Sequence, residues 1–271
     1  MANPVQPYFA LTAEKYYKRN VGAFGIAHIY EYVCQRPEDG RTIAVPDGSI
    51  DVMLDETVPL PDETCYAAGT VLQATKIINA AGHRYFGVRF QTGVMPCFID
   101  GSPQDLISGQ ISLSLCSRYR FPYEQLILLP DFSARADFFL QWYLGILGKN
   151  RPEYGKGQLV SVIRSRIEKS RGILRIADLA DYTGYSSRYI SRVFRELTGL
   201  PPKTYAKIIQ FQEALDHFDH DTMTPLAELA AEHGYFDQPQ FIRDFRKFTS
   251  CTPKQYRTLL GSDYTTRFVM R

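Results

Sequence analysis

The sequence predicts an α+β protein in which a small β-barrel or β-sandwich precedes an all-α domain with two helix-turn-helix motifs. Three observations lead to this prediction. The chain has 271 residues, enough for two domains with separate cores. Short runs rich in β-branched and aromatic residues alternate with turn residues up to about residue 130. Beyond residue 158, apolar residues recur at helical spacings of three and four.

The N-terminal part has the pattern of short strands. Residues 24–33, 70–79 and 85–91 are rich in Ile, Val, Tyr and Phe. Within residues 42–54, the turn signal Pro-Asp-Gly separates two β-branched runs. Short strands at this spacing are typical of a small sandwich or barrel.

A helix over residues 129–147 and a linker are predicted next. The apolar stripe of this helix includes Phe139 and Tyr143 and either packs on the barrel of the same chain or forms a dimer contact. Gly, Pro and charged residues without periodicity then predict a linker. The predicted organisation is a first domain over residues 1–147, a linker over 148–157, a helical domain over 158–261 and a tail over 262–271 without a structural role.

The first helix-turn-helix motif is centred on Gly184. A short helix over residues 174–183 precedes this turn, and a second helix follows it with Ile190, Phe194 and Leu197 on one apolar face. Gly199 supplies a left-handed helix end. The opposite face of the second helix is polar and basic: Arg188, Ser191, Arg192 and Arg195.

The same pattern returns about fifty residues later. Gly184-Tyr185 corresponds to Gly234-Tyr235, and the next helix again has an apolar face with a basic face opposite. The apolar face has Phe241, Phe245 and Phe248; the outward residues are Gln240, Arg243 and Lys247. A repeat that preserves both faces predicts two related DNA-binding units, because a basic helix after a tight turn is typical of entry into the major groove.

One amphipathic helix over residues 203–218 is predicted to join the two units. At about 1.5 Å per residue it is about 24 Å long, which makes it a stiff strut. Such a strut would suit two major-groove segments about one turn, roughly 34 Å, apart. Its inward face is predicted to hold Tyr205, Ile208, Ile209, Gln212, Leu215 and Phe218.

Residues 157–260 resemble the DNA-binding domain of the AraC/XylS family of bacterial transcription regulators. The resemblance is clearest over residues 234–257, Gly-Tyr-Phe-Asp-Gln-Pro-Gln-Phe-Ile-Arg-Asp-Phe-Arg-Lys-Phe-Thr-Ser-Cys-Thr-Pro-Lys-Gln-Tyr-Arg. It implies two helix-turn-helix units in adjacent major grooves of promoter or operator DNA. It also implies a cupin-like N-terminal barrel that senses an effector or dimerises, to which residues 45–54 and 87–90 are similar. Two departures are Ser250, where the family has Gly, and Pro239, which suits only a first helical turn.

The resemblance assigns the DNA-contacting positions. Arginine favours guanine O6 and N7, and glutamine favours adenine N6 and N7. Arg195, Arg246 and Lys247 are expected on phosphates. The predicted DNA-binding residues are Ser187, Arg188, Ser191, Arg192, Arg195, Gln238, Gln240, Arg243, Arg246 and Lys247.

Polar residues among the apolar strands are the candidates for a small-molecule effector site. Arg89 lies between Val88 and Phe90, so it points to one sheet face, either into a pocket or to solvent. The effector-binding candidates are His28, Tyr30, Arg84, Tyr85 and Arg89.

The sequence predicts no enzyme, no cofactor and no metal. It has no zinc-protease, Walker or nucleophile-elbow motif, and its first half holds only two histidines, too few for a cupin metal centre. His217 and His220 stand where solvated polar residues are expected at a helix end. The alternative is a cupin-type ligand-binding or enzymatic protein whose C-terminal helices form a protein-interaction module.

Composition indicates a cytoplasmic protein with no membrane association. Hydrophobic content of 45% and charged content of 22% are ordinary, with no signal peptide and no apolar segment of about 20 residues. The net charge of +2 does not by itself indicate nucleic acid, so the prediction depends on where the arginines lie. The expected partners are double-stranded DNA and an effector, with RNA polymerase and a second copy of the chain as further partners.

Overall fold

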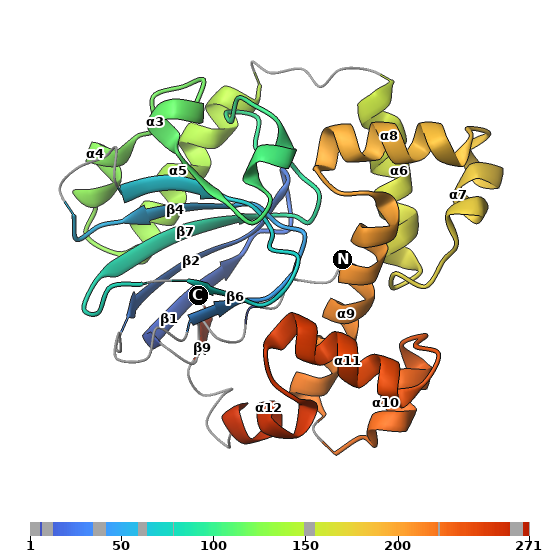
Figure 1. The fold of residues 1–271 in the computed structure, drawn as a ribbon. Helices are drawn as coiled ribbons and strands as arrows, with labels where there is room; N and C mark the ends of the chain where they lie inside the picture. Colours follow the sequence, from blue (N-terminus) through green and yellow to red (C-terminus); the bar gives the residue numbers. More distant parts are fainter. Residues whose placement is uncertain are drawn as a thin grey trace.

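The computed structural model describes residues 6, 13–34, 42–58, 64–77, 79–148, 155–221, 223–260 and 268–270. A β-sheet domain stands beside a helical domain, with the N-terminal half of the chain in the first and the C-terminal half in the second (Figure 1). The predicted α+β class with two helix-turn-helix motifs is confirmed.

The N-terminal domain contains two sheets. The larger has strand order β8-β5-β4-β7-β2-β1-β9, and the smaller pairs β3 with β6. All these pairs are antiparallel except β1 with β9. The strands are β1 Ala13–Asn20, β2 Ile26–Cys34, β3 Thr42–Ala44, β4 Asp51–Asp55, β5 Cys65–Ala68, β6 Thr75–Ile77, β7 Arg84–Phe90, β8 Gln110–Ser112 and β9 Phe268–Met270.

The sheet agrees with the sequence prediction only in part. The four predicted strand regions contain β2, β3, β4, β6 and β7, whereas β1, β5, β8 and β9 were not predicted. The tail was expected to have no structural role, yet Phe268–Met270 pairs with β1 and forms an edge of the larger sheet. Among the described strands the larger sheet has two edges, β8 and β9, so it is open rather than closed into a barrel.

The two faces of the larger sheet pack against different parts of the protein. Alternate side chains of a strand point to opposite faces, so Phe86 and Val88 join one core while Tyr85 and Arg89 face the other way. The first face packs against short helices and one long one (Figure 1). They are η1 Pro103–Leu106, α3 Leu113–Cys116, α4 Tyr123–Ile127 and α5 Phe132–Leu147.

Helix α5 packs on its own domain, which was one of the two predicted alternatives for its apolar stripe. Phe139 and Tyr143 are buried against the sheet. A buried ion pair also fixes the helix, because the Arg135 guanidinium donates to Glu31 Oε2 at 2.6 Å. This interaction joins α5 to β2.

The helical domain follows the predicted repeat. In the first unit α7 and α8 flank Gly184, and in the second α10 and α11 flank Gly234. Helix α6 begins inside the predicted linker, of which residues 149–154 lie outside the described residues. The helices are α6 Lys156–Lys169, α7 Ile176–Thr183, α8 Ser187–Thr198, α9 Pro202–His220, α10 Leu226–Glu232, α11 Gln238–Thr249 and α12 Pro253–Leu260.

Helix α9 belongs to the cores of both units. Its first half buries Tyr205 and Ile209 in a cluster with Phe194 of α8. Its second half buries Phe211, Leu215 and Phe218 in another cluster with the phenylalanines of α11. The predicted strut is therefore confirmed, at about 28 Å for 19 residues.

The C-terminal ends of α8 and α11 differ in one residue that affects stability. Both cap residues are left-handed, Gly199 with φ 80° and Ser250 with φ 63°. A residue with a Cβ in this conformation costs about 1–2 kcal/mol, whereas glycine does not. Ser250 is also exposed, so no packing of its side chain offsets the strain.

Replacing Ser250 by Gly should therefore stabilise the protein by about 1 kcal/mol. The midpoint of thermal unfolding should rise by a few degrees, measured by circular dichroism or calorimetry. Ser250→Ala keeps the Cβ and is the matched control. Equal midpoints for Ser250→Gly and Ser250→Ala would contradict the explanation by backbone strain.

Candidate nucleic-acid interface

Both candidate recognition helices begin with a side-chain cap. Ser186 Oγ accepts from the Tyr189 N–H at the start of α8, and Asp237 Oδ1 accepts from the Gln240 N–H at 2.6 Å at the start of α11. Pro239 lies in the first turn of α11, as predicted, where no intrahelical donor is lost. Each helix is therefore fixed at the end that would enter a groove.

The outward face of α8 is exposed. Ile190, Val193 and Phe194 are buried, while Ser187, Arg188, Arg192 and Arg195 are exposed and Ser191 is partly buried. The Arg192 guanidinium lies 5.2 Å from the centre of the Tyr189 ring. The structure thus brings all five predicted residues of the first unit to one surface.

The second unit has the same arrangement with one difference. Gln238, Arg243, Arg246 and Lys247 are exposed. Gln240 is only partly buried, but its Oε1 accepts from the Phe236 N–H at 2.9 Å. The side-chain carbonyl of Gln240 is therefore used at the start of α11, and only its side-chain NH₂ group is left to donate to a base.

Six basic side chains on these surfaces have no acidic partner in the part of the chain that the structure describes. Among the described residues, no ion pair to Asp or Glu involves any of them. Uncompensated guanidinium and ammonium groups suit phosphate oxygens and guanine edges. The six are Arg188, Arg192, Arg195, Arg243, Arg246 and Lys247.

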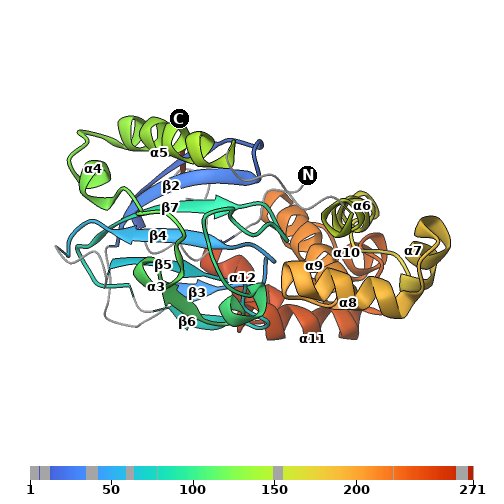
Figure 2. The same ribbon diagram turned by 90° about the horizontal axis from the view of Figure 1, so that it is seen from above.

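The two helices lie on the same side of α9. Figure 1 shows α8 and α11 near opposite ends of α9, and Figure 2, seen from above, shows both helices displaced from α9 in the same direction. Helix α9 is about 28 Å long. This length is close to the roughly 34 Å between successive major-groove segments on one side of a duplex.

Two exposed aromatic residues next to these helices were not predicted. Phe236, directly before α11, is 93% exposed, and Tyr185 is 48% exposed and stacks on Tyr189. Aromatic side chains at this position can contact sugars or thymine methyl groups. The repeated Gly-Tyr pair marked these turns in the sequence, but it did not show which aromatic ring is exposed.

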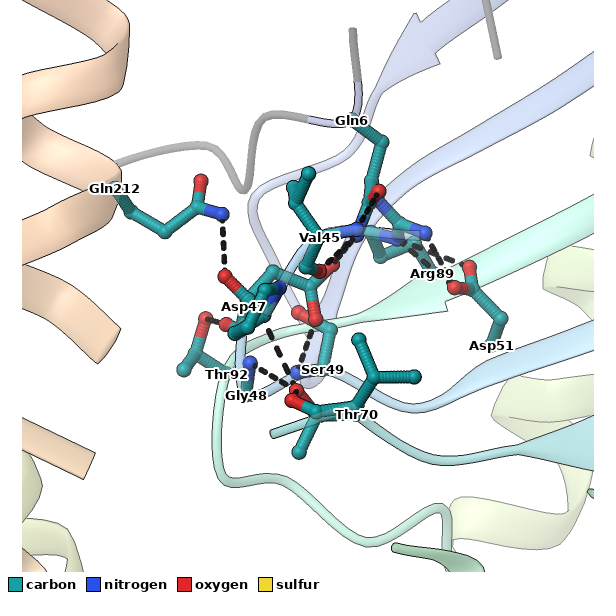
Figure 3. Close-up of polar contacts among 12 residues, drawn as sticks. Gln6, Val45, Asp47, Gly48, Ser49, Asp51, Thr70, Arg89, Thr92 and Gln212 are labelled. Carbon is teal, nitrogen blue, oxygen red and sulfur yellow. Dashed lines mark hydrogen bonds and ion pairs between the residues drawn. The ribbon is translucent and has the colours of Figure 1, made fainter. Parts of the chain in front are cut away.

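The N-terminal domain contacts the C-terminal ends of both helices. Gln104 Nε2 donates to the Arg195 carbonyl at 2.6 Å, and the Ala74 N–H donates to the Lys247 carbonyl at 3.1 Å. The N-terminal domain also contacts α9 at the centre of the helical domain, where Gln212 Nε2 donates to the Pro46 carbonyl at 2.7 Å (Figure 3). These contacts leave the capped N-terminal ends of α8 and α11 uncovered.

A cavity of about 480 Å³ lies between the larger sheet and the β3–β6 sheet. Two of the effector candidates, Tyr85 and Arg89, line it. Arg89 is not solvated: it is 3% exposed and pairs with Asp47 and Asp51 (Figure 3). These two aspartates were missed, because nothing in the local sequence marks them as partners of an arginine about forty residues away.

The other effector candidates have different surroundings. The Tyr30 hydroxyl donates to Asp51 at 3.1 Å, so Tyr30 supports the cavity wall. His28 is buried beside the Tyr30 ring, and this burial holds the pKa of His28 well below its usual range. Arg84 is exposed and lines a separate depression next to α5. The structure thus groups Tyr30, Tyr85 and Arg89 but not Arg84.

One histidine cluster has the donor atoms of a metal site. His217 Nδ1 lies 3.1 Å from His233 Nε2 and 3.6 Å from Glu232 Oε2. His220, the other histidine near this helix end, does not join the cluster among the described residues, and its Nδ1 contacts the Asp216 carbonyl. Three such donors could hold a divalent cation, although a hydrogen bond between the two imidazoles already accounts for the contact.

Comparison with known proteins gives matches to the helical domain. Residues 179–258 match a family described as a helix-turn-helix domain. The F1 operon positive regulatory protein of Yersinia pestis is 30% identical over 101 residues, which are 37% of this chain and 33% of that protein. Uncharacterized HTH-type transcriptional regulators of Staphylococcus aureus are 29% identical over 84 residues, 31% of this chain and 11% of theirs. The chain thus spans about a third or less of the length of these relatives.

Solved structures give matches of the same kind. The C-terminal domain of AraT, a response regulator from Geobacillus stearothermophilus, is 27% identical with a TM-score of 0.34, covering 37% of this chain and 84% of that one. An AraC-type transcriptional regulator from Chromobacterium violaceum is 22% identical with a TM-score of 0.36, covering 41% and 98%. ToxT from Vibrio cholerae is 10% identical with a TM-score of 0.41, covering 86% and 98%.

Among the described residues, no helix is both long enough and apolar enough to span a membrane. The matched segment contains α8, α9, α10 and α11, which carry the exposed basic faces. The relatives that match this segment are named as regulatory proteins. Residues 179–258 are therefore a helix-turn-helix domain.

Proposed function

We propose that this protein is a sequence-specific regulator of transcription that contacts two adjacent major-groove segments of promoter DNA. The observation that carries the proposal is the pair of capped helices, α8 and α11, with exposed arginines on the same side of α9. The relatives of the helical domain are regulators, which supports the same function.

Base contacts are assigned to the residues nearest the capped ends. Arg188, Arg192 and Arg243 carry bidentate donors that suit guanine O6 and N7. Gln238 is exposed for adenine, whereas Gln240 contributes only its NH₂ because its carbonyl caps α11. Arg195, Arg246 and Lys247, further along the helices, contact phosphates and fix the register.

Control of DNA binding is assigned to the N-terminal domain. It holds a cavity lined by polar groups and makes hydrogen bonds to α9 and to both recognition helices. A ligand in this cavity, or a second copy of the chain, could therefore bias the geometry of the two helices. Contact with RNA polymerase belongs to the same proposal, as the route by which a bound regulator acts on transcription.

Single substitutions should separate base contacts from phosphate contacts. Arg192→Ala or Arg243→Ala should cost about 1–3 kcal/mol at a cognate site and relax one base position. Lys247→Ala should weaken binding to all sequences alike and reduce the salt slope by about one. Mobility-shift titrations at several salt concentrations measure both quantities.

The cognate DNA for these titrations is selected from a random library with the wild-type protein. Arg120→Ala is the matched control, because Arg120 is an exposed arginine of the N-terminal domain, paired with Glu124. Equal losses on cognate and random DNA for the Arg192 and Arg243 variants would refute the assigned base contacts. Failure of the wild-type protein to enrich any sequence would refute the proposed function.

A further inference from the structure

The segment from Val45 to Ser49 belongs to both domains at once. Val45 is 1% exposed and packs in the core of the second helical unit with Phe211 and Leu215. The Pro46 carbonyl accepts from Gln212 of α9. Val45, Asp47 and Ser49 nevertheless line the cavity between the two sheets. The cavity wall is thus connected to α9 by a hydrogen bond and by packing (Figure 3).

The buried wall of this cavity has more negative than positive charge. Asp47 and Asp51 share the single guanidinium of Arg89, with Arg89 Nη1 3.2 Å from Asp47 Oδ2 and Nε 3.0 Å from Asp51 Oδ1. Asp55, a third carboxylate on the same wall, lies 2.7 Å from the imidazole of His83 and accepts from the Thr57 N–H at 3.0 Å. Lys76 also lines the cavity, but it is exposed to solvent.

This charge distribution selects against anionic ligands. Arg89 is 3% exposed, and its Nε, Nη1 and Nη2 atoms already bond to the two aspartates. An anion would therefore have to displace a buried carboxylate. Burial raises the pKa of Asp51, and Arg89 offsets only part of this effect. A second cation at the wall would supply the missing positive charge.

A buried hydroxyl on the wall also lacks a partner. Ser49 is 2% exposed, and among the described residues its Oγ makes no hydrogen bond. Its backbone N–H donates to Asp47 at 2.9 Å, so the side chain is held beside the acidic pair. An ammonium group has three donors, which suit the Asp51 carboxylate and the Ser49 hydroxyl together.

We propose that the cavity binds a small molecule carrying a primary ammonium group, at Asp51 and Ser49, and that occupancy is transmitted to α9 through the Val45–Ser49 segment. The transmission part rests on the proposed function, because its output is DNA binding. The binding part does not.

The transmission has two routes, both made of hydrogen bonds. One runs from Asp47 through the Pro46 carbonyl to Gln212. In the other, Thr92 Oγ1 donates to the Asp47 carbonyl at 3.1 Å, and the Tyr205 hydroxyl donates to the Thr92 carbonyl at 3.3 Å. Tyr205 and Gln212 lie in the two halves of α9, so both units are reached.

Binding is tested with 1,4-diaminobutane and phenethylamine as probes, by thermal shift and calorimetry on the full chain. Succinate, 1,4-butanediol and 2-phenylethanol are the matched anionic and neutral controls. At least one amine should raise the unfolding midpoint and bind, while the controls should not. Binding of neither amine, or equal binding of a control, overturns the ligand class.

Two variants locate the site. Asp51→Asn should weaken amine binding about tenfold or more, whereas Asp100→Asn, an exposed aspartate paired with Arg118, should not. If Asp51→Asn fails to fold, Ala68→Leu decides the question, because Ala68 lines the cavity and the larger side chain fills it while all charges remain. Unchanged amine affinity in a folded Asp51→Asn or Ala68→Leu variant overturns the site.

Transmission is tested with Gln212→Ala. In the wild type the bound amine should change the Kd for selected DNA about fivefold or more, in either direction. Gln212→Ala should bind the amine normally but lose most of this response. A full response in Gln212→Ala, or none in the wild type, overturns the transmission. If the wild type binds no DNA, the proposed function fails, while the amine titrations still decide the cavity.

Discussion

The structure depends on helix α9, which contributes buried side chains to the hydrophobic cores of both helix-turn-helix units. A helix-turn-helix unit of about fifty residues is too small to bury much apolar surface alone. Sharing one helix solves this problem, because Tyr205 and Ile209 complete the first core while Phe211, Leu215 and Phe218 complete the second. The same sharing fixes the separation and the relative direction of α8 and α11. A stability requirement and a recognition geometry therefore have one origin.

The N-terminal domain uses this shared helix as its point of contact. Val45 enters the second core, and Gln212 of α9 bonds to the Pro46 carbonyl. Gln104 and Ala74 bond to carbonyls in the last turns of α8 and α11, away from the capped ends. The domain can therefore influence the orientation of the helices without covering the arginines. In the proposed function, this arrangement separates ligand binding from DNA contact.

The sequence predicted the helical domain well and the sheet domain less well, for a physical reason. Helical periodicity is local, so the buried faces around Phe194 and Phe245 were visible within a dozen residues. Strand pairing is nonlocal, and β1, β5, β8 and the C-terminal β9 were missed. Arg89 could not be placed in a pocket or in solvent because its partners, Asp47 and Asp51, are distant in sequence. Eight of the ten predicted DNA-contacting positions are exposed and Ser191 and Gln240 are partly buried, but the use of Gln240 as a cap depends on backbone geometry.

If α9 holds two recognition helices at a fixed spacing on one duplex, DNA binding must depend on the distance between the two contacted segments. A DNA selected by the wild-type protein is compared with versions carrying 5 or 10 extra base pairs between the two protected segments, by mobility shift and hydroxyl-radical footprinting. Because about 10 base pairs make one turn, 5 turn the second segment to the far side of the duplex. Both insertions should abolish simultaneous protection, since a rigid helix of about 28 Å cannot place its second recognition helix at either new position. Simultaneous protection of both segments at unchanged affinity in either DNA would contradict this fixed spacing.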